Sequence, residues 1–363
     1  MSGAAAHFAA SYAQARTKFL GAAAAAGLAV QSHPHPMLGR DGETLAMDVA
    51  RDGADDAGSL LVVSSACHGI EGYCGSGVQH ALLTDEAWRR EARAAGVAVL
   101  YLHALNPHGF SYGRRVTHEN VDLNRNFHDY SQPLPANAGY DALAPYLVPD
   151  TWPPSAENEA HIAAYAARHG ERGLQAAISA GQYRHGCGLF YGGNGPTWSH
   201  LTLRHVLSEH GRRCTRLAWI DLHTGLGPSG HGEKIWAGPD VAAAIARGRR
   251  WWGAEVTSVY DGSSTSALLS GLMFNVVLDE CPQADYTGIA LEYGTEPMNE
   301  VMTALRGDHW LHAHPETGAP QAAEITARTR RAFYTETPAW KQQIVEQGVA
   351  AARQAVAGLA TPA

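Results

Sequence analysis

Histidine and carboxylate side chains with metal-binding spacing occur at three places in the sequence. His68 and Glu71 lie three residues apart in the segment CHGIEG, so an imidazole and a carboxylate can converge on one metal ion from a tight turn. Much further along the chain, His223 lies in DLHTG and Glu292 lies in ALEYG. Two histidines and one glutamate form a zinc site that leaves a coordination position for water, and Glu292 is a further carboxylate that can act as a base. These residues predict metal-assisted hydrolysis.

Arginine and asparagine residues are concentrated in one segment between these motifs. The sequence RRVTHENVDLNRNF contains Arg114, Arg115 and Arg125 together with three asparagines. Guanidinium forks and amides are suited to holding a carboxylate and an oxyanion. A solvated basic turn explains Arg114 equally well, but the segment as a whole indicates a substrate-binding loop.

The predicted strands explain how motifs so far apart in the sequence can meet. Four apolar runs are separated by alanine-rich helical stretches, and this alternation predicts a three-layer α/β/α fold with a central mixed, mostly parallel sheet. Each motif directly follows one of these runs, and ligands bind at the rim where the carboxyl ends of parallel strands meet. The four runs are Ser59–Ser65, Val97–Leu105, Arg216–Leu222 and Gly288–Leu291.

The remaining sequence predicts a single domain over residues 1–363, because it shows no internal repeat and no linker. Proline, alanine and asparagine predict an irregular excursion over 130–154, and glycines predict a loop over 186–195. Capping residues and alanine-rich composition predict three helices. They cover about Ser11–Ala26, a stretch from Ser155 towards His169 with Gly170 as its stop, and about Ala339–Leu359 at the C-terminus.

Composition and charge exclude several classes of protein. The chain has 363 residues, of which 45% are hydrophobic, and a formal net charge of −8. This charge argues against binding to nucleic acid or to an anionic membrane. No apolar run is long enough to span a bilayer, and the first residues lack the compact basic region of a signal peptide. The five cysteines form no CxxC pair, so we expect a reducing cytoplasm and no disulfide framework.

The ordered motifs HGIEG, NPHG with RRVTHENVDLNRNF, DLH and LEYG resemble those of zinc carboxypeptidases of the M14, or carboxypeptidase A-like, superfamily. More narrowly, the chain resembles the bacterial DUF2817 group of that superfamily over most of its length. The resemblance implies one zinc ion per chain, bound by His68, Glu71 and His223, with Glu292 as general base and acid. The implied substrate is a small peptide or an N-acyl amino acid with a free carboxylate.

The resemblance also implies roles for the basic segment. Arg115 matches the arginine that polarises the scissile carbonyl, while Asn124 and Arg125 match the pair that grips the terminal carboxylate of the substrate. Asp122 matches the carboxylate that orients the first zinc histidine, which fixes the tautomer and raises the basicity of that ligand. Tyr260 is the candidate for the tyrosine that closes over the substrate in digestive enzymes, although core packing also explains it.

The sequence around the second zinc histidine differs from that of the digestive enzymes, because DLHTG is closer to the deacylase and amidase branches. Asp221 and His223 would share one face of a continuing strand, so Asp221 can either orient His223 or cap the loop. The implied activity is hydrolysis of an amide bond next to a free carboxylate, as in a metallocarboxypeptidase. The alternative is an aspartoacylase-like deacylase or amidase acting on small N-acyl amino acids at the same site.

Other histidines and cysteines have simpler explanations. We expect the HPH segment at 33–35 and the HAH segment at 312–314 to be exposed turns, and Cys67 and Cys74 to be small packing residues. A non-catalytic binding module with the same fold is a further alternative. The presence of all three ligands and Glu292 argues against it.

Overall fold

A mixed seven-stranded sheet forms the centre of this computed structural model, which describes residues 3–361. The strand order is β1-β2-β4-β3-β5-β7-β6. The four central strands run parallel, whereas β1, β2 and β6 pair antiparallel with their neighbours, so the predicted mixed, mostly parallel sheet is confirmed. The strands are β1 (Val30–Leu38), β2 (Thr44–Asp52), β3 (Ser59–Ser64), β4 (Val97–His103), β5 (Arg216–Ser229), β6 (Gly232–Trp236) and β7 (Asp285–Gly294).

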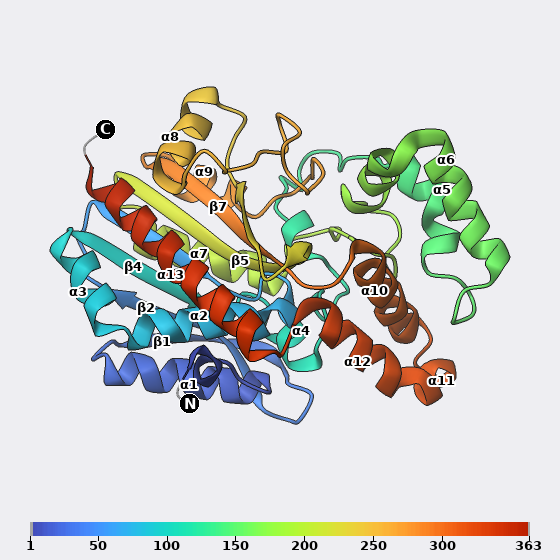
Figure 1. Cartoon of the computed structure of the whole chain (residues 1–363), viewed down its shortest axis with the longest axis horizontal. Coiled ribbons are helices and arrows are strands. Elements are labelled where there is room, and N and C mark those ends of the chain that lie inside the picture. Colours follow the sequence, from blue (N-terminus) through green and yellow to red (C-terminus); the bar gives the residue numbers. More distant parts are fainter. Residues whose placement is uncertain (1–2, 362–363) are drawn as a thin grey trace.

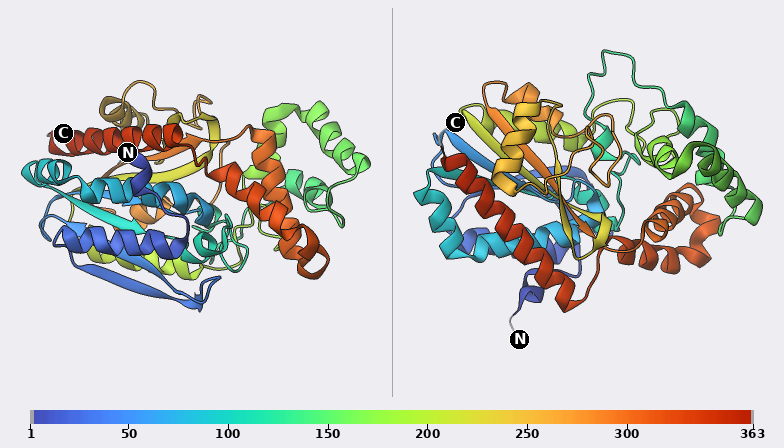
Figure 2. Two further views of the ribbon diagram at one scale, coloured as in Figure 1. Left: turned by 60° about the horizontal axis from the view of Figure 1, so that its bottom comes forward. Right: turned by 45° about the horizontal axis from the view of Figure 1, so that its top comes forward.

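Helices cover both faces of the sheet (Figures 1 and 2). Side chains of β3 alternate between two apolar clusters: Leu61 and Val63 pack with α1, α2, α3, α8 and α13, while Leu60 and Val62 pack with α7 and α9. This alternation is the physical basis of the three layers. The helices are α1 (Tyr12–Ala25), α2 (Gly72–Thr84), α3 (Glu86–Ala94), α4 (Pro107–Tyr112), α5 (Ala138–Leu147), α6 (Ala156–Ser179), α7 (Trp198–Gly211), α8 (Ala242–Trp252), α9 (Asn275–Glu280), α10 (Met298–Ala313), α11 (Pro315–Gly318), α12 (Ala322–Phe333) and α13 (Pro338–Ala360).

Capping side chains set the starts of the two terminal helices, both of which were predicted. Ser11 accepts a hydrogen bond from the backbone N–H of Gln14 at the start of α1. Thr337 does the same for Trp340 in α13, where Pro338 occupies the first helical position. Beyond the sheet rim, α5, α6, α10 and α12 form a helical lobe (Figure 1). Within residues 3–361 we find no helix whose length and apolar character would allow it to cross a membrane.

The segment 130–154 is less irregular than predicted, because it contains α5. Asn137 caps this helix by accepting from Tyr140 N, and Tyr140 and Leu147 are buried on the same side. Pro145 lies inside the helix. That proline and the proline-rich flanks hide the helical periodicity in the sequence.

Two further segments differ from the prediction. The backbone leaves the helical conformation at the expected stop, Gly170, which has φ 75°, but a second helical stretch follows at once, so that α6 extends to Ser179. The expected exposed turn at His33 and His35 is instead part of β1, where His35 is buried and its ring lies 4.7 Å from that of Trp198. His312 is exposed as predicted, but it belongs to the last turn of α10.

Candidate active site

The candidate site lies at the carboxyl ends of the central strands. His223 and Glu292 are paired residues on the neighbouring strands β5 and β7. His68 follows β3 and precedes a 3-10 turn at Gly69–Glu71. This turn packs tightly against the start of α4, since a side chain at Gly69 would come within 2.1 Å of the carbonyl carbon of Gly109. Only glycine fits at that position.

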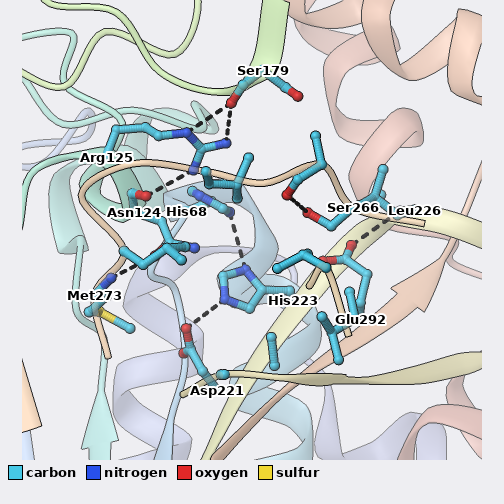
Figure 3. Close-up of a pocket in the computed structure, with 18 of the residues that line it drawn as sticks. His68, Asn124, Arg125, Ser179, Asp221, His223, Leu226, Ser266, Met273 and Glu292 are labelled. Atoms are coloured by element: carbon cyan, nitrogen blue, oxygen red, sulfur yellow. Dashed lines mark hydrogen bonds and ion pairs between the residues drawn. The ribbon is translucent and has the colours of Figure 1, made fainter. Parts of the chain in front are cut away.

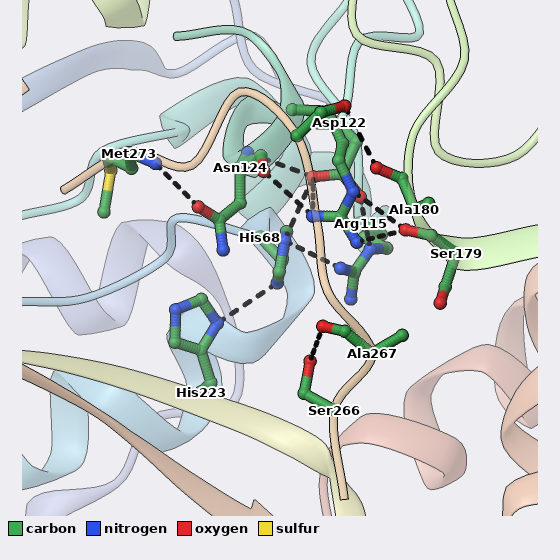
Figure 4. A network of polar contacts seen from close by, with 12 residues as sticks. His68, Arg115, Asp122, Asn124, Ser179, Ala180, His223, Ser266, Ala267 and Met273 are labelled. Carbon is green, nitrogen blue, oxygen red and sulfur yellow. Dashed lines mark hydrogen bonds and ion pairs between the residues drawn. The ribbon is translucent and has the colours of Figure 1, made fainter. Parts of the chain in front are cut away.

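The three predicted metal ligands converge at one point of this rim. Nδ1 of His68 lies 2.9 Å from Oε1 of Glu71, and Nδ1 of His223 lies 3.0 Å from the other carboxylate oxygen, Oε2. The two Nδ1 atoms are 3.2 Å apart (Figures 3 and 4). All three side chains are buried. The sequence segments that carry them are 152 residues apart, and the sheet brings them together.

Two carboxylates contact the Nε2 atoms of the imidazole rings, on the side opposite the converging Nδ1 atoms. Nε2 of His68 lies 3.2 Å from Oδ1 of Asp122, and Nε2 of His223 lies 2.5 Å from Oδ2 of Asp221. Burial opposes the charge on His223, but the adjacent Asp221 and Glu71 outweigh it and hold its pKa well above the usual value. Asp221 favours a proton on Nε2 of His223, so Nδ1 of this ring can act as a ligand. Asp122 favours the same tautomer of His68, whereas the Arg115 Nη2 donor, which also faces Nε2 of His68, opposes it. Of the two roles open for Asp221, its position supports orientation of His223.

The positions of these atoms fit a zinc ion. Tetrahedral zinc with bonds of about 2.0–2.1 Å keeps its ligand atoms about 3.3–3.4 Å apart, and the separations here are 2.9–3.2 Å. A second buried group, formed by Cys67, Asp221 and His223, also has ligand atoms close together. Burial raises the pKa of the Cys67 thiol well above its usual value, so a metal ion there would first have to displace the thiol proton.

Glu292 is a buried carboxylate that lines the cavity beside the ligands. Its Oε1 accepts a hydrogen bond of 3.1 Å from the backbone N–H of Leu226 (Figure 3). Burial, followed by the negative charge of Glu71, raises the pKa of Glu292 to about 8. A cation at the ligands would lower this pKa again. A carboxyl group whose pKa is tuned towards neutrality can take up a proton and return it.

Arg115 is a buried cation in contact with the ligand group. Its Nη1 donates to Oε1 of Glu71 and its Nε donates to Oδ2 of Asp122, both at 3.0 Å, and its Nη2 lies 2.8 Å from Nε2 of His68 (Figure 4). Burial opposes its charge, but Asp122 and Glu71 outweigh burial and raise the pKa of Arg115. Its guanidinium therefore remains charged beside the cavity, where it can stabilise an anion.

Asn124 and Arg125 line the same cavity. The Asn124 carbonyl Oδ1 accepts from Met273 N at 2.9 Å, which directs the amide nitrogen away from Met273 (Figure 4). Arg125 donates from Nε and Nη2 to the backbone oxygen of Ser179 and from Nη1 to that of Asn124. These bonds use three of the five N–H groups of the guanidinium, so one N–H on each terminal nitrogen remains for a ligand.

The sequence left open whether residues 189–193 line a pocket or only pack as a loop, and the structure places Phe190 of this segment in the cavity wall. The Phe190 ring lies under both guanidinium groups, 5.4 Å from Cζ of Arg115 and 5.5 Å from Cζ of Arg125. The glycine-rich sequence around it was the available signal, and Phe190 itself has φ 52°. Tyr260 lines the cavity, as expected for a substrate contact, but its hydroxyl donates to the Gly238 carbonyl at 3.1 Å.

Fold and site together define an α/β protein with a buried two-histidine, one-glutamate metal-binding geometry at the sheet rim. A family model described as "Protein of unknown function (DUF2817)" matches residues 8–347, so the chain belongs to the DUF2817 family. The family resemblance predicted from the motifs is thereby confirmed. No protein with a curated description matches the chain.

Several solved structures are similar to the chain. Thrombin-activatable fibrinolysis inhibitor shares 13% identity, with a TM-score of 0.48 over 88% of this chain and 77% of its own. The bovine form of that protein, in complex with tick carboxypeptidase inhibitor, shares 9% identity, with a TM-score of 0.48 over 97% of each chain. A metallo-carboxypeptidase from Burkholderia cenocepacia shares 12% identity, with a TM-score of 0.40 over 83% of this chain and 68% of its own.

Proposed function

We propose that this protein is a zinc-dependent hydrolase that cleaves an amide bond next to a free carboxylate, as a metallocarboxypeptidase does. The observation that carries the proposal is the convergence of His68, Glu71 and His223 beside a cavity that both histidines and Glu292 line. Bound by the three ligands, zinc would supply a Lewis acid that polarises the carbonyl and makes a water molecule more acidic.

The remaining residues divide the work between the reacting bond and the end of the substrate. Glu292 accepts the proton of the attacking water and delivers it to the leaving amine. Arg115 stabilises the negative charge that develops on the carbonyl oxygen. The amide of Asn124 and the two uncommitted N–H groups of Arg125 bind the substrate carboxylate, which sets the position of cleavage. Tyr260 contributes to the wall that the substrate contacts.

The same carboxylate clamp also suits an N-acyl amino acid, so a deacylase or amidase is the second candidate. The two activities differ only in what lies on the acyl side of the cleaved bond. We further propose a cytoplasmic location, which the free state of all five cysteines supports.

Product analysis on matched substrates tests both candidates. Zinc-loaded protein is incubated with a panel of short peptides, their C-terminal amides and N-acetyl amino acids, and the products are identified by mass spectrometry. We expect release of the C-terminal residue from free acids, loss of activity with a chelator, and its return with zinc. Cleavage of N-acetyl amino acids alone would favour the deacylase. Internal cleavage, or activity that a chelator leaves unchanged, would contradict both.

A further inference from the structure

A segment between α8 and α9 runs along the cavity, and we call it the strap. It comprises residues 265–273 and forms no helix or strand of its own, so its position depends on its contacts with neighbouring segments. Figure 4 shows it running from Ser266 through Ala267 to Met273. The strap residues that line the cavity are Ser266, Ala267, Leu269, Leu272 and Met273.

The C-terminal end of the strap contacts the residues proposed to bind the substrate carboxylate. Met273 N donates to Asn124 Oδ1 at 2.9 Å, and the Gly271 backbone oxygen accepts from Phe127 N at 3.1 Å. Gly271 has φ 68°, and a side chain there would come within 2.3 Å of the Arg125 backbone oxygen. Because Met273 fixes Oδ1 of Asn124, the position of the strap decides where the Asn124 amide nitrogen points.

A buried carboxylate holds the other end of the strap. Glu233 of β6 is 7% exposed. It accepts a hydrogen bond of 3.1 Å from the backbone N–H of Thr265 and a second one from the Thr265 hydroxyl. It also accepts from Thr257 Oγ1 at 2.5 Å. Both carboxylate oxygens are therefore bonded to the loop that leads into the strap.

The other contacts of the strap are neutral hydrogen bonds. Gln175 Nε2 of α6 donates to the Thr265 backbone oxygen at 2.9 Å in an exposed position, and Ser270 N donates to the Ala180 backbone oxygen at 3.0 Å. Hydrogen bonds to a carboxylate are roughly twice as strong as neutral ones. Glu233 therefore makes the strongest contacts at the N-terminal end of the strap.

We infer that Glu233 is a positioning residue, which anchors the strap and thereby holds the Asn124 amide in the orientation that binds the substrate carboxylate. This role rests on the proposed function. In the described structure the Glu233 side chain bonds only to Thr257 and Thr265, so its removal leaves the contacts of the metal ligands unchanged. Its loss should weaken substrate binding and leave the chemical step nearly unaltered.

The kinetic test measures kcat and KM for a free-acid substrate. In Glu233→Ala, KM should rise at least about tenfold while kcat falls less than about threefold. Glu233→Gln keeps the shape and one acceptor oxygen, so its KM should lie between those of Glu233→Ala and the wild type. A wild-type KM in both variants, or a fall in kcat as large as the rise in KM, would overturn the inference.

Glu255→Gln provides the matched control for both Glu233 variants. Glu255 also joins the chain before Thr257 to β6, because its Oε1 lies 2.9 Å from Nζ of Lys234. Its side chain is 65% exposed, and it has no bond to the strap. This variant should keep the wild-type kcat and KM.

Hydrogen exchange, followed by mass spectrometry, separates this inference from the proposed activity because it needs no substrate. In zinc-loaded Glu233→Ala, peptides covering 265–273 should exchange at least about tenfold faster than in the wild type, and peptides covering β3 and β4 should keep their rates. If no substrate is hydrolysed but the strap alone exchanges faster, the anchor stands and the proposed hydrolase fails. If the strap keeps its rate in both Glu233 variants, or β3 and β4 exchange faster as well, the assigned role is wrong.

Discussion

Replacing Asp221 with asparagine tests the role of the carboxylate behind His223. Asp221 Oδ2 lies 2.5 Å from His223 Nε2, and its other oxygen accepts from Ser64 Oγ, also at 2.5 Å. The Asp221 side chain is buried, so solvent screens this contact weakly. An asparagine side chain at this position would have nearly the same shape and would keep one neutral acceptor for the imidazole N–H. The change therefore removes charge and leaves packing almost unaltered.

The expected cost follows from the strength of the bond that is weakened. Hydrogen bonds to charged groups contribute about 1.5–3 kcal/mol, and neutral ones about 0.5–1.5 kcal/mol. The difference of roughly 1–1.5 kcal/mol predicts that Asp221→Asn binds zinc about tenfold more weakly than the wild type. Asp221→Ala also leaves the imidazole N–H without a partner, so we expect a loss approaching 100-fold.

Zinc affinity is measured by competition with a chelator of known affinity at constant pH. Asp48→Asn provides the matched control, because Asp48 is also a buried carboxylate but bonds Arg16 and Ser32 outside the site. It should leave zinc affinity unchanged, whatever its effect on stability. If Asp221→Asn and Asp221→Ala both bind zinc as tightly as the wild type, Asp221 does not support His223 as a ligand.

Three further predictions follow from other groups in the structure. Glu292→Gln should lower kcat by about 10²–10⁴-fold and leave zinc content unchanged, because the amide cannot accept a proton; wild-type turnover in this variant would remove Glu292 from the mechanism. Arg125→Ala should lower kcat/KM far more for a free acid than for its C-terminal amide. Arg115→Ala should lower kcat/KM for both substrates by about 10²–10³-fold. If Arg125→Ala lowers kcat/KM equally for the acid and the amide, Arg125 only holds its loop. Burial lowers the pKa of His103 to about 4, so between pH 6.5 and about 4 the unfolded chain takes up a proton that the folded chain does not. Urea unfolding of metal-free protein should therefore show that the free energy of unfolding decreases as the pH is lowered through this window, and His103 should contribute up to about 1.4 kcal/mol per pH unit to the decrease. If the free energy of unfolding of a His103→Gln variant has the same slope against pH as that of the wild type, this prediction is wrong.

The central strands could be predicted from the sequence because they are covered on both faces. The runs starting at Ser59, Val97 and Arg216 are apolar nearly throughout, and the structure begins β3, β4 and β5 at these residues. Motifs that directly follow such strands must lie at one rim, so the convergence of His68 with His223 could also be anticipated. A constraint on one short segment, such as burial of both faces of a strand, leaves a pattern in the residue types of that segment.

Features that depend on contacts between distant segments could not be predicted. β1 carries two prolines and two histidines, and its extended form depends on pairing with β2. The position of Phe190 under two arginines depends on the fold of a glycine-rich loop, for which local periodicity gives no signal.

A crystal structure of the zinc-loaded protein, with anomalous data at the zinc absorption edge, tests the central claim most directly. We predict one strong peak per chain, bonded to Nδ1 of His68, the carboxylate of Glu71 and Nδ1 of His223 at about 2.0–2.2 Å. A peak on Cys67, Asp221 and His223, a peak elsewhere, or a structure in which Glu71 points away from both imidazoles would contradict the metal site on which the proposed hydrolase depends.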